Sequence, residues 1–195
     1  MASKTIIGII LAAGESKRMG FPKALLAIQG TSFVRSIIEK HRQAGIEQII
    51  VVTGAHCEDV GNEVNVPGVT VAHNKDYMRG QLSSIQTGIK AAEQFLFDAI
   101  LLHPVDHPLI TGDTITLLIE QYRAASFPIV LPTYQKKRGH PVIFSSSLFP
   151  ELYAAPADIG ARSVVWNHKA EVLEIETADK GILQNIDTPE TYENL

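Results

Sequence analysis

The sequence contains one cysteine, no excess of basic residues and no long apolar run. The single cysteine, Cys57, cannot form an internal disulfide, and residues 1–5 lack the apolar core of a signal peptide. No apolar run approaches the roughly 20 residues of a membrane-spanning helix. Lys and Arg number 17 against 21 Asp and Glu, so the net charge of -4 gives no general basic field for a nucleic acid. We therefore expect a cytoplasmic protein that binds neither nucleic acid nor membrane.

The remaining composition is that of a folded globular protein. Of the 195 residues, 45% are hydrophobic, 19% are charged and 7% are aromatic, which excludes the disordered and collagen-like classes. A typical domain has roughly 150 residues, and the sequence shows no linker, repeat or low-complexity stretch. We therefore expect one domain over residues 1–195.

Short aliphatic runs alternate with segments of helical periodicity along the chain. Runs bounded by Gly, Pro, Asn or Asp predict strands at 6–11, 48–53, 69–73, 99–103, 129–133, 141–144 and 172–175. The periodicity of apolar residues predicts helices over 34–45, 82–96, 115–122, 147–153 and 160–168. Thr31 and Thr111 are the expected N-caps of the first and third helices. Strands joined by such helices favour right-handed crossovers, so the predicted fold class is α/β, with three layers and a mostly parallel sheet.

The first predicted strand is followed by the segment Leu11–Lys23, which reads LAAGESKRMGFPK. Ligands of open α/β sheets bind beyond the carboxyl ends of the strands, so this loop is the first candidate site. Its two glycines allow backbone amides to approach an anion, and Lys17, Arg18 and Lys23 outnumber its one acidic residue. The spacing fits neither the ATPase P-loop nor the dinucleotide-binding glycine pattern. On these residues alone, a phosphate site and an exposed turn with solvated basic side chains are equal alternatives.

Asp106 and Asp187 are the candidate ligands of a hard cation. Asp106 follows a predicted strand between two prolines, which would fix an oxygen ligand for a Mg²⁺ ion that bridges phosphates. Asp187 would supply a second carboxylate. Each also has a structural interpretation, Asp106 as a turn residue and Asp187 as the neighbour of a helix start with Thr188 at the N-cap. Because Mg²⁺ prefers oxygen, His103 and His107 are interpreted as structural or substrate-side residues.

Three further segments have features of anion sites. Gly80–Ile85 opens a helix with a glycine and two hydroxyls, and 136–140 is a basic turn before a strand. Asp158–Arg162 places an arginine near a helix start. The alternatives are a well-capped helix, a solvated charge run and a surface salt bridge. Trp166 is interpreted as a packing residue.

The thirteen positions of the first loop resemble the signature L-A-A-G-x-S-x-R-M-G-x-P-K of the MobA-like NTP transferases. Within that family they are most similar to the molybdenum cofactor cytidylyltransferase branch. The P-x-D-x-P segment at Asp106, the R-G-H-P segment at Arg138, the D-x-G-A-R segment at Arg162 and the N-I-D-T-P-E segment at Asp187 resemble elements of the same family in the same order.

The resemblance implies a Rossmann-like domain and a role for each segment. Arg18, Lys23 and Asp106 would be catalytic, and Asp106 and Asp187 would hold Mg²⁺. The implied nucleotide-binding residues are Leu11, Ala12, Ala13, Gly14, Gly80, Gln81 and Ser84. The implied acceptor-binding residues are Arg138, His140 and Arg162.

The activity implied by the resemblance is transfer of a nucleoside monophosphate from an NTP to the terminal phosphate of molybdopterin or the molybdenum cofactor. Pyrophosphate would be released, and Mg²⁺ would be the cofactor. Ala13 stands where guanylyltransferases of the family usually carry glycine, which favours CTP over GTP. The implied partners are the NTP, a phosphorylated pterin-type acceptor and a molybdoenzyme client. Two alternatives stay open: a nucleotidyltransferase for a sugar phosphate or other small phosphorylated alcohol, and a non-catalytic cofactor-binding chaperone for molybdoenzymes.

Overall fold

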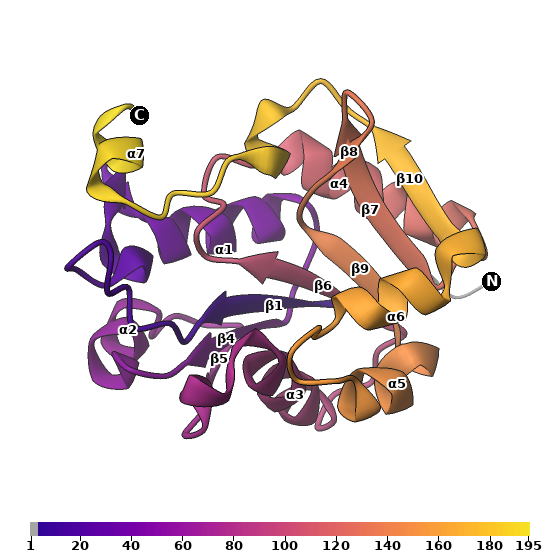
Figure 1. Ribbon diagram of the computed structural model, residues 1–195, viewed down its shortest axis with the longest axis horizontal. Helices are drawn as coiled ribbons and strands as arrows, with labels where there is room; N and C mark the ends of the chain where they lie inside the picture. Colours follow the sequence, from indigo (N-terminus) through magenta and orange to yellow (C-terminus); the bar gives the residue numbers. More distant parts are fainter. Residues whose placement is uncertain (1–3) are drawn as a thin grey trace.

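A computed structural model describes residues 4–195 and is built around one large, mostly parallel sheet (Figure 1). The strand order is β10-β7-β9-β6-β1-β4-β5, with β8 paired to β7. The order is parallel except for β9, which runs antiparallel to both of its neighbours, and for β8. The strands are β1 (Ile6–Ala12), β4 (Ile49–Thr53), β5 (Val69–His73), β6 (Ala99–Pro104), β7 (Ile129–Tyr134), β8 (Lys137–Arg138), β9 (Val142–Ser145) and β10 (Val172–Glu176).

Helices cover both faces of this sheet. The helices are α1 (Phe33–Gln43), α2 (Cys57–Glu63), α3 (Gln81–Ala92), α4 (Gly112–Ala124), α5 (Phe149–Ala154), α6 (Arg162–Asn167) and α7 (Pro189–Glu193). In Figure 1, α1 and α4 lie above the strands, and α3 and α5 lie below them. The three-layer α/β prediction is therefore confirmed.

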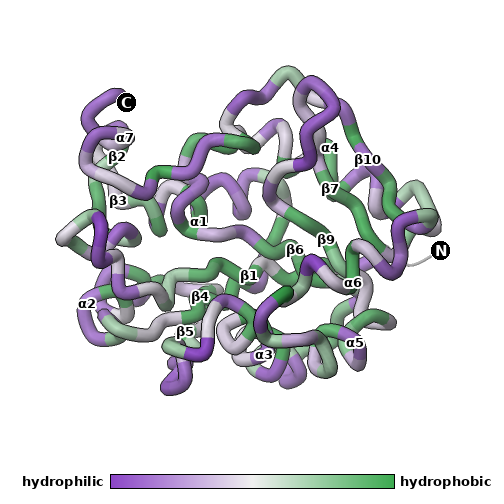
Figure 2. Tube along the Cα trace, in the orientation of Figure 1, coloured by the Kyte–Doolittle hydropathy of each residue, from purple (hydrophilic) through white to green (hydrophobic). Residues whose placement is uncertain are grey.

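The core consists of two apolar layers, one on each face of the sheet. Along β1, Ile6 and Ile10 belong to the layer under α1 and α4, whereas Ile7 and Ile9 belong to the layer over α3 and α5. This alternation follows from the two-residue period of a strand. The strands are the most continuously hydrophobic segments in Figure 2, as expected for strands covered on both faces.

The structure corrects several predicted boundaries. The N-cap of α1 is Ser32 and not Thr31, because the Ser32 hydroxyl accepts from the amide of Arg35 at 3.3 Å. Thr31 lies one residue earlier, in a short hairpin of β2 (Ala27–Ile28) and β3 (Thr31–Ser32). Thr111 caps α4 as predicted. The helix predicted over 82–96 ends at Ala92, and the apolar Leu96 beyond it is 95% exposed. Within residues 4–195, no helix combines the length and apolar character needed to cross a bilayer.

The register of the parallel strands brings four loops to one edge. Ala12 pairs with Thr53, Thr53 pairs with His73, and Leu11 pairs with Pro104. The loops after β1, β4, β5 and β6 therefore start side by side. This is the edge at which open α/β sheets bind ligands.

Candidate functional site

The loop after β1 is held in shape by its own serine. Ser16 lies at φ 54, and its carbonyl oxygen accepts hydrogen bonds from the amides of Met19 at 2.9 Å and Gly20 at 3.0 Å. Its hydroxyl accepts from the amide of Lys23 at 3.0 Å. The loop therefore curls around one residue, which fixes the backbone from which Lys23 projects.

The loop after β4 packs directly on this first loop at Gly54. A Cβ atom at Gly54 would lie 2.4 Å from the carbonyl oxygen of Ala13, so no larger residue fits there. The amide of Ala55 donates to the same oxygen at 3.3 Å. The sequence analysis did not single out Gly54, although a glycine that directly follows a buried strand was a usable signal.

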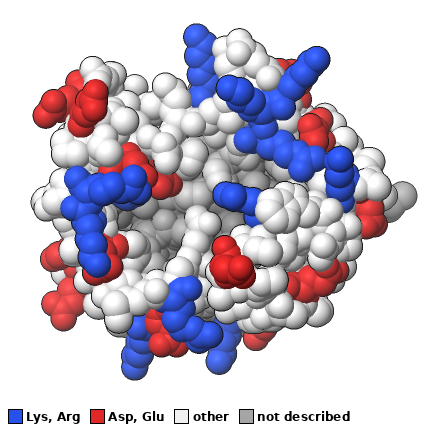
Figure 3. Space-filling view, in the orientation of Figure 1, with Lys and Arg blue, Asp and Glu red and all other residues white. Residues whose placement is uncertain are grey.

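A cleft of about 350 Å³, here called the loop cleft, lies between the first loop, α3 and the end of β6. It is lined by all seven residues predicted to bind nucleotide: Leu11, Ala12, Ala13, Gly14, Gly80, Gln81 and Ser84. Lys23 and Asp106 line it as well. Figure 3 shows the molecule hollowed near the centre of this face, with basic side chains on both sides of the hollow.

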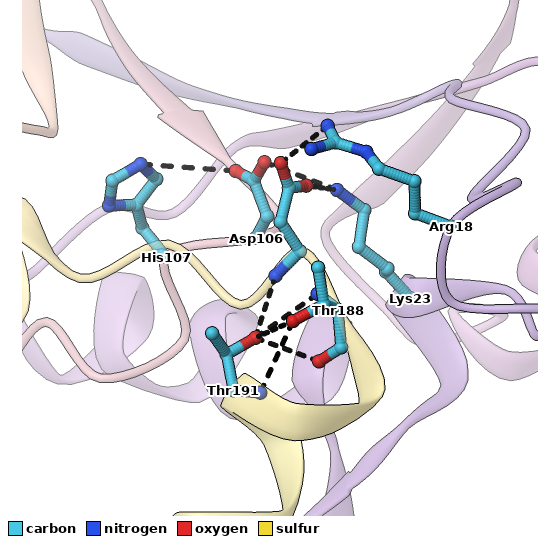
Figure 4. Close-up of polar contacts among 7 residues, drawn as sticks. Arg18, Lys23, Asp106, His107, Thr188 and Thr191 are labelled. Atoms are coloured by element: carbon cyan, nitrogen blue, oxygen red, sulfur yellow. Dashed lines mark hydrogen bonds and ion pairs between the residues drawn. The ribbon is translucent and has the colours of Figure 1, made fainter.

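Both candidate metal ligands form ion pairs with cations of the first loop, and Figure 4 shows Asp106 beside Lys23 and Arg18. The Lys23 ammonium lies 2.6 Å from the Asp187 carboxylate and 3.3 Å from that of Asp106. The Arg18 guanidinium lies outside the cleft lining and donates to Asp187 at 2.6 Å. The hydrogen bond from Lys23 is the largest cause that lowers the pKa of the Asp187 carboxyl, and the charges of Lys23 and Arg18 add to it.

The backbone of the C-terminal segment brings Asp187 to this place. The amide of Ile186 donates to the carbonyl oxygen of Asp106 at 2.7 Å, which fixes the segment beside the end of β6. Thr188 and Thr191 then form a capping box at the start of α7. The helix-start interpretation of this segment is therefore correct, and the same turn presents Asp187 to Lys23.

The two carboxylates fit a hard divalent cation. They converge on one ammonium group, so the structure already places a positive charge between them. Among residues 4–195, no group of three or more His, Cys, Asp or Glu side chains could hold a metal alone. Mg²⁺ is commonly bound by one or two carboxylates, with water and substrate phosphates as the other ligands. Asp106 and Asp187 match that arrangement.

The first turn of α3 forms the opposite wall of the loop cleft. Gly80 is its N-cap at φ 94, a conformation that favours glycine. No side chain caps this helix, so its first amides have no side-chain partner. Free amides at a helix N-terminus favour negative charge, and the residues Gly80, Gln81 and Ser84 face a cleft that already contains Lys23.

A second cavity of about 540 Å³, here called the side hollow, adjoins the loop cleft and shares Gln81 with it. All three predicted acceptor residues line it. The Arg138 guanidinium pairs with Glu174 at 2.5 Å, whereas Arg162 forms no ion pair or side-chain hydrogen bond within the described part of the chain. The apolar lining includes Leu82, Ile85, Leu131, Val142, Phe144 and Val165.

Trp166 lies at the side hollow and is not a packing residue. Its side chain is 57% exposed, contrary to the expectation from the sequence. The helix that carries it, α6, has only six residues and buries only Val164 fully. A helix of this length has too little inward-facing surface to cover a large indole.

Four histidines form a row between the apolar core and the side hollow. His41 and His103 contact through ring nitrogens at 3.0 Å, and His103 contacts the carbonyl oxygen of His107 at 3.1 Å. The rings of His107 and His140 are 4.8 Å apart. Burial lowers the pKa of His41 to about 3 and that of His140 to about 4. His103 is fully buried and has a structural role, as one of its two interpretations predicted.

Comparisons with known proteins agree with this geometry. The sequence profile of the MobA-like NTP transferase domain matches residues 8–172. Purine catabolism protein PucB of Bacillus subtilis is 28% identical over 99% of this chain and 97% of its own length. Nicotine blue oxidoreductase of Paenarthrobacter nicotinovorans is 29% identical over 95% of this chain and 93% of its own length. Molybdenum cofactor cytidylyltransferase of Escherichia coli is 31% identical over 94% of this chain and 92% of its own length.

Solved structures share the whole fold. The crystal structure of Rv0371c from Mycobacterium tuberculosis superposes with a TM-score of 0.83 at 28% identity, over 100% of this chain and 98% of the other. The same mycobacterial protein in complex with manganese superposes with a TM-score of 0.75 at 25% identity, over 98% and 97%. Since the family profile spans most of the chain and the relatives align nearly end to end, this chain belongs to the MobA-like NTP transferase family and is a nucleotidyltransferase.

Proposed function

We propose that the protein, as one domain over residues 1–195, transfers a nucleoside monophosphate from an NTP to the terminal phosphate of a molybdopterin-type cofactor. CTP is the favoured donor, and pyrophosphate is the second product. The observation that carries the proposal is the junction of two cavities at Gln81: a loop cleft with phosphate-binding features and a side hollow with an arginine, Arg162, that forms no ion pair within residues 4–195. A reaction between two phosphorylated substrates needs such adjoining sites.

The loop cleft supports binding of the donor triphosphate. The amides of the first loop and of the first turn of α3 face the phosphates, and Lys23 and Arg18 contribute positive charge. Both cations are held by Asp187 in this structure. They exchange that carboxylate for phosphate oxygens when the nucleotide binds.

The side hollow supports an acceptor with an anionic end and a ring system. Arg162 forms no ion pair within residues 4–195, so it is available to an acceptor phosphate, and Arg138 and His140 line the same hollow. The apolar lining and the exposed face of Trp166 suit a flat heterocycle. A sugar phosphate, whose hydroxyls need hydrogen-bond partners, matches these walls less well.

The chemistry requires positioning and charge neutralisation and no general base. An oxygen of the acceptor phosphate, already anionic, forms a bond to the α-phosphorus. The bond from the α-phosphorus to the bridging oxygen breaks, and that oxygen leaves with its electron pair in pyrophosphate. Lys23 stabilises the charge that develops during this exchange, because its ammonium projects into the cleft from a fixed backbone.

Mg²⁺ is the proposed cofactor, held by Asp106 and Asp187, and when bound it supplies charge neutralisation at the phosphates. The proposed product, a cofactor joined to a nucleotide, then passes to a molybdoenzyme client.

Pyrophosphate release tests the proposal and the donor preference together. Purified protein receives each of four NTPs with Mg²⁺ and either molybdenum cofactor or a sugar phosphate. We expect release only with the pterin acceptor and with the highest kcat/KM for CTP. We attribute this preference to the methyl group of Ala13, and a preference based on such a small apolar difference is roughly 10- to 200-fold in kcat/KM. Ala13→Gly should therefore reduce the ratio of kcat/KM for CTP to kcat/KM for GTP. Release with the sugar phosphate alone would overturn the acceptor, and equal efficiency with CTP and GTP would overturn the cytidylyl assignment.

A further inference from the structure

Asn74 lies just after β5, outside the segments that form the proposed reaction site. The residue is 3% exposed, and both polar atoms of its side chain form hydrogen bonds. The side-chain amide nitrogen donates to the hydroxyls of Ser83 at 2.9 Å and Ser84 at 3.0 Å. The side-chain oxygen accepts from the amide of Asp76 at 3.0 Å, and the backbone amide donates to Thr53 at 2.8 Å. Asn74 therefore ties the ends of two strands to the first turn of α3.

The two serines that Asn74 contacts differ in what their hydroxyls do. The hydroxyl of Ser83 has acceptors for its own hydrogen, since it lies 2.8 Å from the carbonyl oxygen of Gly80 and 3.1 Å from that of Asp76. The hydroxyl of Ser84 has none among residues 4–195, although it accepts from Asn74. Ser84 also lines the loop cleft, whereas Ser83 does not.

The geometry points to Asn74 as a positioning residue for the nucleotide. A hydroxyl has one hydrogen and two acceptor sites. Because Asn74 donates to Ser84, the hydrogen of Ser84 is turned away from Asn74 and is left for an oxygen atom in the loop cleft. This inference rests on the proposed function, since the oxygen that accepts this hydrogen belongs to the bound NTP, on its phosphates, ribose or base.

Asn74 also sets where that hydrogen bond is made. It joins the backbone of Thr53 to Ser84, and Thr53 pairs with Ala12 of the first loop. The two walls of the loop cleft are therefore linked through the pairing of β1 with β4 and through the hydrogen bonds of one buried residue, Asn74. A displacement of α3 relative to the first loop would change the distance between the Ser84 hydroxyl and a nucleotide held by the loop amides.

A double-mutant cycle on nucleotide binding tests this role. The dissociation constant for CTP with Mg²⁺ is measured by titration calorimetry, without acceptor, for the wild type, Asn74→Ala, Ser84→Ala and the double variant. Loss of one hydrogen bond to a charged or strongly polar ligand weakens binding about ten-fold. We expect about that loss from Ser84→Ala, a comparable loss from Asn74→Ala, and no further loss when the two are combined.

Ser83→Ala is the matched control, because Ser83 accepts an equivalent hydrogen bond from the same amide nitrogen. The Asn74→Ala loss should persist in the Ser83→Ala background and disappear in the Ser84→Ala background. Equal losses in both backgrounds would show a merely structural role and overturn the inference. Unchanged CTP affinity in Asn74→Ala would also overturn it.

A second substitution guards against misfolding. Thermal unfolding without nucleotide identifies whether Asn74→Ala folds, and if it does not, Asn74→Asp replaces it in all three backgrounds. Any effect of the new charge of Asn74→Asp on CTP affinity is then present in every background. Only the part of the affinity loss that is absent in the Ser84→Ala background is counted as coupling between Asn74 and Ser84. Failure of the wild type to bind any of the four NTPs would instead refute the proposed function itself. The two failures are therefore distinguishable.

Discussion

The loop cleft and the side hollow both gather basic side chains, but they hold them differently. Lys23 in the loop cleft and Arg18 just outside its lining are paired with carboxylates from the end of β6 and from the C-terminal segment. In the side hollow, Arg162 has no ion-pair partner within residues 4–195, and the surrounding walls combine apolar with polar side chains. A cation in an ion pair must break that pair before it can bind a phosphate, whereas a cation without a carboxylate partner can bind one directly.

This difference assigns a distinct electrostatic task to each cavity. In the loop cleft, cation and carboxylate sites are interleaved, so binding of a metal and of phosphates should be mutually dependent. The side hollow is suited to a ligand with one anionic group and a ring system that packs on its apolar side chains. The following experiments use this contrast, beginning with the largest expected effect.

Replacement of Lys23 should have the largest effect on catalysis. We expect Lys23→Ala, and to a similar degree Arg18→Ala, to lower turnover by about two to three powers of ten, the range for loss of one preorganised charge donor. The matched control is Lys17→Ala in the same loop, because Lys17 pairs with Glu15 and its side chain is 78% exposed. Wild-type turnover in a folded Lys23→Ala protein would refute the role assigned to Lys23.

Neutralising the carboxylates should change the metal requirement. Asp106→Asn and Asp187→Asn keep their shapes but lose a charged oxygen ligand. Loss of groups that merely orient metal ligands costs about 10- to 100-fold in metal affinity, so each variant should need at least about ten-fold more Mg²⁺ for half-maximal pyrophosphate release. The control is Glu15→Gln, because Glu15 lines the same cleft but pairs with Lys17 and not with Lys23 or Arg18. Unchanged Mg²⁺ titrations for both aspartate variants would remove these residues from the metal site.

Replacement of the side-hollow arginines should affect the acceptor and not the nucleotide. Arg162→Ala should raise the KM of the acceptor about ten-fold, as expected for one hydrogen bond to a charged group, with the KM of the NTP unchanged. Arg138→Ala should have a smaller effect, because its guanidinium already pairs with Glu174 at the surface. Steady-state kinetics with each substrate varied in turn separate these outcomes. A larger change for the NTP than for the acceptor would show that the two cavities are wrongly assigned.

Acid should destabilise the protein through the histidine row between the apolar core and the side hollow. Burial holds the pKa of His41 at about 3, below the ordinary value of about 6.5. The unfolded chain therefore binds the proton first, so the contribution of neutral His41 to stability is complete above pH 6.5. It is lost by about 1.4 kcal/mol per pH unit as the pH falls from 6.5 toward 3. Denaturant unfolding at pH 7, 6 and 5 measures this slope.

His168 provides the opposite case for the same experiment. Hydrogen bonds from its ring to Glu171 and Glu151 raise its pKa. Its contribution is therefore present below pH 6.5 and is lost as the pH rises through that raised value. His41→Gln should flatten the acid slope, and His168→Gln should not. An unchanged slope in His41→Gln would show that neutral His41 does not contribute to acid stability.

The fold and the loop cleft were predictable because their signals are local. A strand such as Ile6–Leu11 and the loop after it are read from adjacent residues, and hydrophobic periodicity locates the helices. Thr31 was wrongly assigned as an N-cap because the hairpin at 27–32 has too few residues to give a strand pattern. Trp166 was taken for a packing residue because its six-residue helix could not be distinguished from a longer one.

Features that join distant segments were not readable in the same way. The ion pair between Lys23 and Asp187 connects residues 164 positions apart, and no periodicity predicts it. Gly54 and Asn74 act where separate loops meet, so their importance depends on the register of β1, β4 and β5. The resemblance assigned Arg138, His140 and Arg162 to one acceptor site, but it could not show that Arg138 pairs with Glu174, because Glu174 lies on the distant strand β10.

The central claim, transfer of a nucleotide to a phosphorylated pterin, is tested most directly by following the α-phosphate. The protein is incubated with CTP labelled at the α-phosphorus, Mg²⁺ and molybdenum cofactor, and the products are separated and identified by mass spectrometry. The account predicts that the label appears in the acceptor, one CMP unit for each pyrophosphate released, and that Lys23→Ala lowers the rate of both by about two to three powers of ten. Label recovered only in free CMP, or only in unreacted CTP while the acceptor stays unchanged, would contradict it.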